Sequence, residues 1–210
     1  MKNVILYGAP AAGKGTQCEL LVSNHGYKVI SIGQVLRNQR NPETEIGRII
    51  IETQDKGVLT PDDIVAKALM EELKKYDNVP LIIDGYPRNL NQAKLLDTIF
   101  DNYVVINIKV DYDVAMRRTL GRLTCSGCGK IYNIYNKKLT PKQDGICDIC
   151  GGKLNKRSDD NEESFKTRFD VYMKNVEGVL DYYDNKKLLY VFDKTDTKEL
   201  YESIKEVIKW

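Results

Sequence analysis

The chain of 210 residues is long enough to build one substantial hydrophobic core with small inserted lobes. Its net charge is only +2, with 32 basic and 30 acidic side chains, so no strong bulk field recruits nucleic acid or a membrane surface. The N-terminal apolar run is too short for a signal peptide, and no stretch approaches the ~20 apolar residues of a membrane span. We therefore expect a cytoplasmic protein, in which paired cysteines bind metal more readily than they form disulfides.

Short apolar runs alternate with helical patterns along the chain, which is the arrangement of parallel β-α-β units. Continuous apolar runs are typical of strands that are buried on both faces of a sheet. The predicted strands are residues 4–8, 28–31, 80–84, 103–109 and 188–192. The predicted helices include residues 60–76, 89–100, 111–120, 162–184 and 197–210. The sequence therefore predicts an α/β protein with a three-layer α/β/α core.

The first predicted strand leads into "GAPAAGKGTQ" at residues 8–17, a glycine-rich loop that opens a helix. Gly8, four further residues and then Gly13-Lys14 match the first part of the phosphate-binding pattern G-x-x-x-x-G-K-[ST]. In such loops, backbone N–H groups and a helix N-terminus face the phosphates, and the lysine reaches the β- and γ-oxygens. Here Gly15 follows the lysine, and the hydroxyl comes one place later at Thr16.

Two stretches interrupt the alternation, residues 32–60 and residues 122–159. The first has the pattern of short helices, and the second has cysteines, glycines and polar residues without a long apolar run. We expect both to be lobes inserted into one core domain. The helix that follows the first stretch has clear start signals, with Thr60 as the cap, Pro61 at the first helical position and Asp63 completing a capping box.

Several polar residues have the chemistry of a nucleotide site. Asp84 ends the third predicted strand, at the edge where open α/β sheets bind ligands, and could orient water on a phosphate-bound magnesium ion. Gln92 offers an amide that matches the hydrogen-bonding edge of adenine. Arginine suits phosphate because its planar fork donates two parallel hydrogen bonds. The candidate phosphate-binding arginines are Arg37, Arg88, Arg122, Arg157 and Arg168.

Four cysteines form two pairs in the pattern C-x2-C-x18-C-x2-C, at Cys125, Cys128, Cys147 and Cys150. This spacing is typical of a four-cysteine zinc site, and no further cysteine or histidine lies in the lobe to suggest an open coordination position. A lobe of about forty residues buries too little apolar surface to be stable alone, so we expect a structural metal. Iron, a disulfide pair and a redox site are the alternatives.

The same lobe has features of a nucleic-acid module, because lysines and tyrosines are interleaved in it. These residues are Lys130, Lys137, Lys138, Lys142, Lys153, Tyr132 and Tyr135. Arg122 and Arg157 stand at the two hinges of the lobe, however, so a lid that closes over a nucleotide is the simpler interpretation.

The motifs of the chain resemble those of adenylate kinase in order and spacing, over essentially the whole length. They are "GAPAAGKGTQ" (8–17), "SIGQVLR" (31–37), "DGYPRNLNQ" (84–92), "RTLGR" (118–122) and "RSDDNEESFKTR" (157–168). The cysteine lobe is similar to the lid of the long-form bacterial enzymes that carry zinc. The resemblance implies reversible transfer of the γ-phosphoryl group of ATP to AMP, giving two ADP. It also implies a P-loop fold with a five-stranded parallel sheet, magnesium with ATP, and a monomer without nucleic-acid or membrane partners.

By this resemblance the core domain comprises residues 1–31, 61–121 and 160–210, with an AMP-binding lobe at 32–60 and a zinc-binding lid at 122–159. The implied catalytic residues are Lys14, Asp84, Arg88, Arg122, Arg157 and Arg168. The implied ATP-binding residues are Ala11, Ala12, Gly13, Lys14, Gly15, Thr16, Arg118, Arg122, Ile131, Tyr132 and Asp196. The implied AMP-binding residues are Ile32, Arg37, Val58, Leu59, Thr60, Gly85, Tyr86, Pro87, Arg88, Gln92, Arg157 and Arg168.

The chain departs from the family pattern at a few positions. The family usually has glycine at the position of Ala11 and threonine at that of Ile32. It usually has an aspartate that helps to organise the magnesium water shell at the position of Gln34, and a histidine at that of Asn133. These departures bear on acceptor preference and rate more than on fold or reaction class. Two other functions stay open, a kinase for UMP or CMP and a non-catalytic nucleotide- or nucleic-acid-binding protein.

Overall fold

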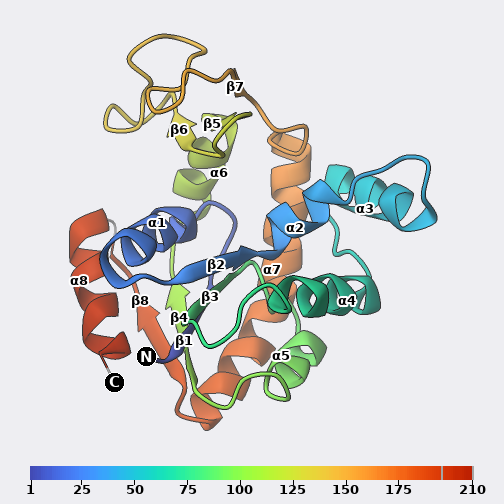
Figure 1. The fold of residues 1–210 in the computed structure, drawn as a ribbon, viewed down its shortest axis with the longest axis vertical. Helices are drawn as coiled ribbons and strands as arrows, with labels where there is room; N and C mark the ends of the chain where they lie inside the picture. The colour runs from blue at the N-terminus through green and yellow to red at the C-terminus, as the bar shows by residue number, and fades with distance from the viewer. Residues whose placement is uncertain (195, 210) are drawn as a thin grey trace.

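The structure is a computed structural model that describes residues 1–194 and 196–209 (Figure 1). Its strands are β1 (Asn3–Tyr7), β2 (Lys28–Ser31), β3 (Leu81–Asp84), β4 (Tyr103–Ile108), β5 (Arg122–Cys125), β6 (Ile131–Asn133), β7 (Leu154–Asn155) and β8 (Leu189–Phe192). Its helices are α1 (Lys14–His25), α2 (Ile32–Asn38), α3 (Glu45–Lys56), α4 (Asp62–Leu73), α5 (Leu90–Leu96), α6 (Tyr112–Leu120), α7 (Glu162–Asn185) and α8 (Thr197–Ile208). No helix in these described ranges combines the length and the hydrophobicity that crossing a membrane requires.

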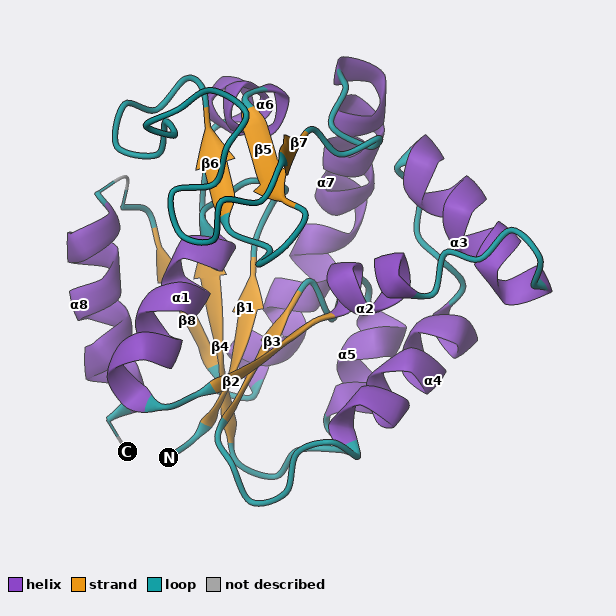
Figure 2. Ribbon diagram, turned by 45° about the horizontal axis from the view of Figure 1, so that its top comes forward, coloured by secondary structure: helices purple, strands orange, loops and turns teal. Residues whose placement is uncertain are grey.

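The central sheet has five parallel strands in the order β2-β3-β1-β4-β8. Side chains alternate between the faces of a strand, so neighbouring residues enter different layers. Leu6 packs in a cluster with residues of α1 and α8, whereas its neighbour Ile5 packs in a cluster with residues of α4, α5 and α7. Figure 2 shows the sheet between these two sets of helices. The predicted three-layer fold with a five-stranded parallel sheet is therefore confirmed.

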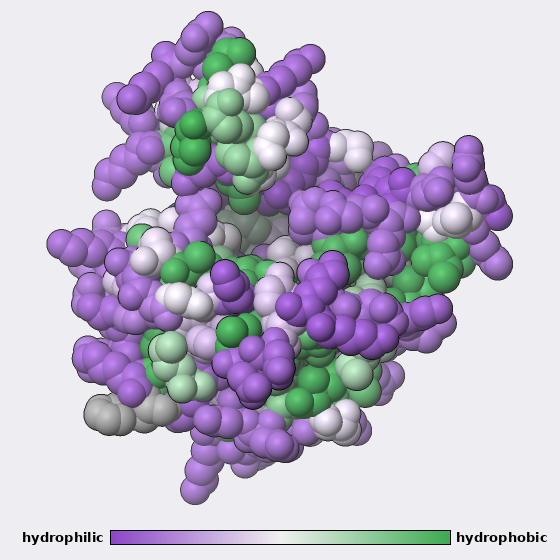
Figure 3. All heavy atoms as spheres, viewed as in Figure 1, coloured by the Kyte–Doolittle hydropathy of each residue, from purple (hydrophilic) through white to green (hydrophobic). Residues whose placement is uncertain are grey.

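Two parts of the chain project from this core near the carboxyl ends of the strands. Helices α2 and α3 extend to one side, and residues 122–159 form a separate lobe above the sheet (Figure 1). The lobe contains a small antiparallel sheet in the order β6-β5-β7, which the sequence analysis did not predict. In the space-filling view the lobe stands over a hollow in the molecular surface (Figure 3). The edge of the sheet thus lies beneath an overhanging lobe.

The predicted start of α4 is wrong in its details. The helix begins at Asp62, Pro61 is its N-cap residue, and no side chain caps it. The Thr60 hydroxyl instead lies 2.9 Å from the hydroxyl of Thr53 in α3. A tertiary hydrogen bond has therefore replaced the local capping bond that the sequence pattern indicated. The predicted helix at 89–100 is also shorter, since α5 ends at Leu96, and Trp210 of the predicted last helix lies outside the described residues.

Candidate active site

Two adjoining cavities open at the carboxyl edge of the central sheet, beneath the lobe of residues 122–159. The first cavity extends toward α2, α3 and the segment after α3. The second extends over the N-terminus of α1 toward β6. The residues that line both cavities are Ala11, Lys14, Ser31, Arg37, Asp84, Arg122 and Arg157. Two bound molecules would therefore meet at a junction that holds one lysine, one carboxylate and three arginines.

Most of the predicted acceptor-site residues line the first cavity. They are Arg37, Val58, Leu59, Thr60, Gly85, Pro87, Arg88, Arg157 and Arg168. Ile32, Tyr86 and Gln92 are buried beside this set and outside the lining. The Gln92 amide donates to the Asp62 carboxylate at 2.7 Å and accepts from the backbone N–H of Arg88 at 2.8 Å. In this conformation the amide therefore supports the loop that carries Arg88, and its role in reading a base stays a prediction.

The second cavity gathers most of the predicted ATP-site residues. They are Ala11, Ala12, Gly13, Lys14, Gly15, Thr16, Arg118, Arg122 and Ile131. Two predicted residues lie outside this lining. Asp196 caps α8, where its carboxylate accepts from the N–H groups of Lys198 and Glu199, and Tyr132 is buried against the cysteine cluster. Their predicted contacts with ATP stay predictions.

The loop between β1 and α1 packs closely against the end of β4 and is closed by the side chain of Lys14. At Gly8 a Cβ atom would lie 2.5 Å from the carbonyl oxygen of Ile108, so only glycine fits there. The Lys14 ammonium donates to the carbonyl oxygens of Gly8 and Ala9, each at 2.9 Å, and therefore curls over the loop. Burial lowers the pKa of Lys14 from its ordinary value, while the charge of Asp84 opposes this change.

Ala11 lies at the top of the same loop with φ at 56°, in the left-handed region that glycine adopts more easily. This is the position where the family usually has glycine. The backbone therefore keeps the conformation that glycine would allow and accepts a Cβ atom at a cost of about 1 kcal/mol.

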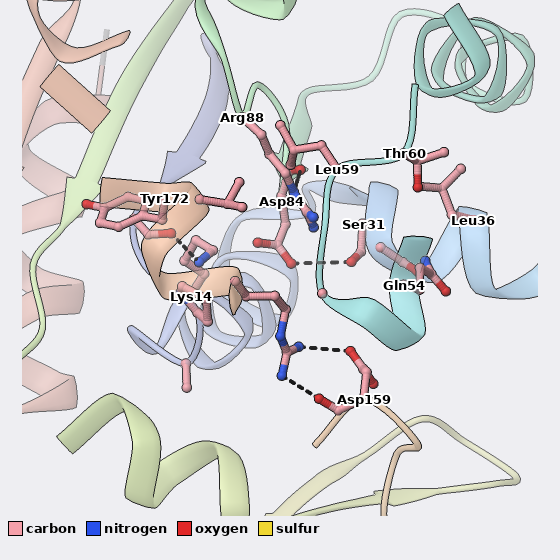
Figure 4. A pocket seen from close by; sticks show the side chains of 18 of the residues that line it. Lys14, Ser31, Leu36, Gln54, Leu59, Thr60, Asp84, Arg88, Asp159 and Tyr172 are labelled. Carbon is pink, nitrogen blue, oxygen red and sulfur yellow. Dashed lines mark hydrogen bonds and ion pairs between the residues drawn. The ribbon is translucent and has the colours of Figure 1, made fainter. Parts of the chain in front are cut away.

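Asp84 is the carboxylate at the junction of the cavities, at the end of β3 (Figure 4). Its Oδ2 accepts a hydrogen bond from the Ser31 hydroxyl at 3.3 Å. Its Oδ1 is buried and has no hydrogen-bond partner among the described residues. A buried carboxylate oxygen without a partner suits a hydrated divalent cation, because metal-bound water would supply the missing donor. Figure 4 shows Lys14 and Arg88 near this carboxylate.

Two arginines that line the cavities, Arg122 and Arg168, are held by aspartates that the sequence analysis did not single out. Asp160 binds the guanidinium of Arg122, with Nε 2.8 Å from Oδ2, and Asp159 binds Arg168 at 2.8 Å. Arg157 instead donates to the hydroxyl of Thr124 at 3.2 Å. Burial and the charges of nearby arginines lower the pKa of Arg157 to about 10. The site therefore concentrates positive charge, as an anion-binding site requires.

These missed residues left partial signals in the sequence. Asp159 and Asp160 follow Arg157 almost directly in "RSDD", and Ser31 ends the second predicted strand at the ligand-binding edge. Strand-end position alone could have identified Ser31. The pairing of the two aspartates with arginines on other elements could not be read from spacing.

Gln34 also has a role that the sequence analysis did not foresee. Its side-chain oxygen accepts from both Nε and Nη2 of Arg37, each at 3.1 Å, and its amide nitrogen donates to Asn38 at 2.8 Å. Guanidinium groups only donate, so the amide oxygen must face Arg37. Gln34 lines the second cavity, whereas Arg37 lines both. The side chain at this position therefore orients an arginine of the junction.

The four predicted metal ligands come together in the lobe. One sulfur atom from each of Cys125, Cys128, Cys147 and Cys150 lies within 4.8 Å of all the others. The Sγ atoms are 3.4 Å apart in the 125–150 pair and 3.6 Å apart in the 128–147 pair. Four thiolates in a tetrahedron around zinc at ~2.3 Å would be about 3.8 Å apart, so the cluster fits this ion. All five cysteines of the chain are free thiols.

The two cysteine pairs have the same turn geometry. The N–H of Gly129 donates to the carbonyl of Cys125 at 3.1 Å, and the N–H of Gly151 donates to the carbonyl of Cys147 at 2.9 Å. Both glycines have positive φ, 74° and 70°, which closes each turn behind the second cysteine. Two equivalent turns therefore present four sulfur atoms to one point, which supports metal binding over a disulfide.

Comparison with known proteins places the chain in a family. The family model described as adenylate kinase matches residues 6–188. The chain belongs to the adenylate kinase family. An adenylate kinase from Methanosarcina barkeri is 42% identical over 215 aligned positions, which cover 99% of this chain and 98% of that protein. The chain is also similar to an adenylate kinase from Bacillus subtilis, with 40% identity over 98% of this chain and 97% of that protein. It is 38% identical to an adenylate kinase from Caldicellulosiruptor bescii, over 99% of this chain and 97% of that protein.

Membership of the adenylate kinase family confirms the reaction class predicted from the sequence. The chain is a nucleotide-binding phosphotransferase, and adenylate kinases use magnesium with ATP. The three relatives above all carry the name adenylate kinase, so they favour neither a UMP or CMP kinase nor a nucleic-acid-binding protein. The cysteine cluster is able to hold a metal ion in this adenylate kinase fold.

Proposed function

We propose that the chain transfers the γ-phosphoryl group of ATP to AMP, reversibly, at the junction of its two cavities. The observation that carries this proposal is the shared lining, because it lets the phosphates of two nucleotides meet beside Lys14 and Asp84. ATP would occupy the second cavity, with its phosphates on the loop before α1. AMP would occupy the first cavity. An oxygen of the AMP phosphate attacks the γ-phosphorus, the bond to the β–γ bridging oxygen breaks, and two ADP result.

The proposed catalytic roles follow from the positions of the charges. Phosphoryl transfer requires alignment of the two substrates and stabilisation of the charge on the transferring group. We assign Arg37 and Arg88 to the acceptor phosphate, and Lys14 to the β- and γ-phosphates. Arg122, Arg157 and Arg168 surround the transferring group. A magnesium ion bound with ATP would neutralise part of the phosphate charge, and Asp84 would hold its water.

The proposed base contacts are separate from this junction. Arg118 lines the second cavity, where its guanidinium could stack on the adenine of ATP. Val58, Leu59 and Thr60 line the first cavity and not the second, and the AMP base would lie against them. We assign the adenine edge of AMP to Gln92, whose amide would exchange its bond to Asp62 for the base.

We further propose that residues 32–60 are the AMP-binding lobe and that residues 122–159 are a zinc-stabilised lid. The sulfur geometry of the four cysteines supports zinc, and the two equivalent turns support a structural site. From the family resemblance we propose a monomer that acts in the cytoplasm on ATP, AMP and ADP without a nucleic-acid partner.

A coupled assay with ATP and AMP, CMP or UMP, each in turn, tests the reaction and the acceptor. We expect AMP to be the preferred acceptor by a large factor, because a site built for one base leaves polar groups unpaired with another. Faster turnover of CMP or UMP would overturn the acceptor assignment. No transfer to any monophosphate would overturn the catalytic proposal.

A further inference from the structure

Tyr132 lies at the point where the cysteine cluster meets the surface of the lobe that faces the nucleotide cavity. It is the central residue of β6, and its neighbours Ile131 and Asn133 both line the second cavity. Because side chains alternate along a strand, Tyr132 points to the opposite face. There it is only 5% exposed and packs with Cys125 and Cys147 in the small core of the lobe.

The Tyr132 hydroxyl lies within hydrogen-bond distance of two groups, a backbone N–H and a cysteine sulfur. The backbone N–H of Asp148 donates to the phenolic oxygen at 2.8 Å. Since a backbone N–H can only donate, the oxygen acts as the acceptor in that bond, and its own proton is free for another partner. The Sγ atom of Cys147 lies 3.5 Å from the same oxygen. When Cys147 is a metal-bound thiolate its sulfur can only accept, so the phenolic O–H is then the donor in this pair.

We propose that Tyr132 is a positioning residue for the metal, acting as an outer-sphere hydrogen-bond donor to the thiolate of Cys147. Four thiolates carry two more negative charges than a divalent ion neutralises, so donors to sulfur stabilise such a site. The N–H of Gly127 gives the same help to Cys125 at 3.3 Å. Partners of this kind orient the ligands and raise metal affinity. Tyr132 also connects the metal site to the second cavity, because it contacts the ligand Cys147 and belongs to β6, the strand that borders the cavity.

This inference rests on the proposed metal site, and a comparison of two tyrosine variants tests it. Tyr132→Phe keeps the buried ring and removes only the hydroxyl. Tyr135→Phe makes the same change in the same lobe, at a residue that is 52% exposed and whose ring lies over the guanidinium of Arg117. The full-length wild type and both variants are titrated with zinc in competition with a chromophoric chelator. We expect zinc affinity to fall roughly tenfold in Tyr132→Phe. We expect Tyr135→Phe to match the wild type.

Cobalt substitution separates the hydrogen bond from simple packing. A thiolate that loses a hydrogen bond is easier to oxidise, so its charge-transfer band to cobalt should move to longer wavelength in Tyr132→Phe and stay unchanged in Tyr135→Phe. Unchanged zinc affinity in Tyr132→Phe, or weaker affinity with an unshifted band, would overturn the inference. A wild type that binds neither zinc nor cobalt would overturn the metal site together with it. Loss of the assigned AMP kinase activity alone would leave these metal measurements as they are.

Discussion

The central sheet and the cysteine lobe reach a defined shape by different means. Strands such as β1 and β4 are buried on both faces, and residues such as Ile5 and Ile106 have no exposed surface. The core of the lobe consists of four buried residues, Cys125, Tyr132, Cys147 and Leu154. Hydrophobic burial therefore stabilises the sheet, whereas the lobe has a small apolar core and would depend on the metal proposed at its sulfur cluster. The two cavities lie at the edge of the sheet, and the proposed metal would fix the shape of the lobe that covers them.

The contacts between the two regions differ between the tip of the lobe and its base. Lys130 of the lobe forms an ion pair with Glu19 of α1 at 2.6 Å, across the mouth of the second cavity. Both side chains are partly exposed, so this pair contributes little to stability. Two ion pairs that are largely buried, Arg122 with Asp160 and Asp159 with Arg168, join the base of the lobe to the core instead.

The largest expected effect is a loss of stability when the sheet core is truncated. We expect Ile106→Ala to lower the free energy of unfolding by about 3 kcal/mol, because it leaves a cavity among fully buried side chains. Ile149→Ala removes a similar side chain from the lobe, where it is 68% exposed, and should change that free energy by less than about 0.5 kcal/mol. Denaturant unfolding measures both. Equal losses would show that the lobe is packed like the sheet.

The next effect concerns the chemistry at the sheet edge. We expect Asp84→Asn to lower turnover roughly 100-fold, because the amide adds no negative charge to the water shell of magnesium. Asp101→Asn removes a carboxylate from an exposed site before β4 and should leave turnover unchanged. Steady-state kinetics at saturating nucleotide measure both variants. Full activity in Asp84→Asn would remove this carboxylate from the mechanism.

A smaller effect is expected at Gln34, which orients Arg37. Losing the two hydrogen bonds in Gln34→Ala should cost about 1 kcal/mol, or about a fivefold rise in KM for AMP, with little change in kcat. Gln39→Ala, at another exposed glutamine near the end of α2, is the matched control. If Gln34→Ala had a normal KM for AMP but needed a different magnesium concentration, position 34 would instead act on the water shell of magnesium, as the aspartate of the family does.

The smallest effect is expected in the phosphate loop. Ala11→Gly removes the steric strain of an alanine in the left-handed region, which stabilises the folded state. It also makes the unfolded chain more flexible, which opposes this gain. We therefore expect the free energy of unfolding to rise by only about 0.5 kcal/mol. Ala12→Gly changes the buried residue next to it and should lower the free energy of unfolding by about 1 kcal/mol. Thermal unfolding of the two variants measures the contrast. A loss of stability in Ala11→Gly would mean that the loop carries no strain at this position.

The contrast between the regions also explains what the sequence could predict. The sheet strands and the loop at Lys14 were predictable because continuous apolar runs and a glycine-rich phosphate loop are local patterns. The lobe strands β5, β6 and β7 were not, because they contain two to four residues and no long apolar run. The cysteine spacing still indicated the cluster, since four sulfur ligands need few other residues.

Within the site, predictions failed where a tertiary contact replaced a local one. Thr60 had the signals of a helix cap, but its hydroxyl faces Thr53. The interaction of Gln34 with Arg37 could have been predicted from the sequence, because residues three apart share one face of a helix. The face of the lobe toward which the Tyr132 side chain points follows from the alternation of side chains along β6, but the sequence analysis did not predict that strand.

We propose that the sheet is stable without metal and that the lobe requires it, and amide hydrogen exchange on the protein with and without zinc tests this proposal most directly. After chelation, we expect amides of residues 122–159 to lose their protection, while amides of β1, β3 and β4 keep theirs. Equal protection of the lobe in both samples would contradict the account, as would simultaneous loss of protection in the sheet.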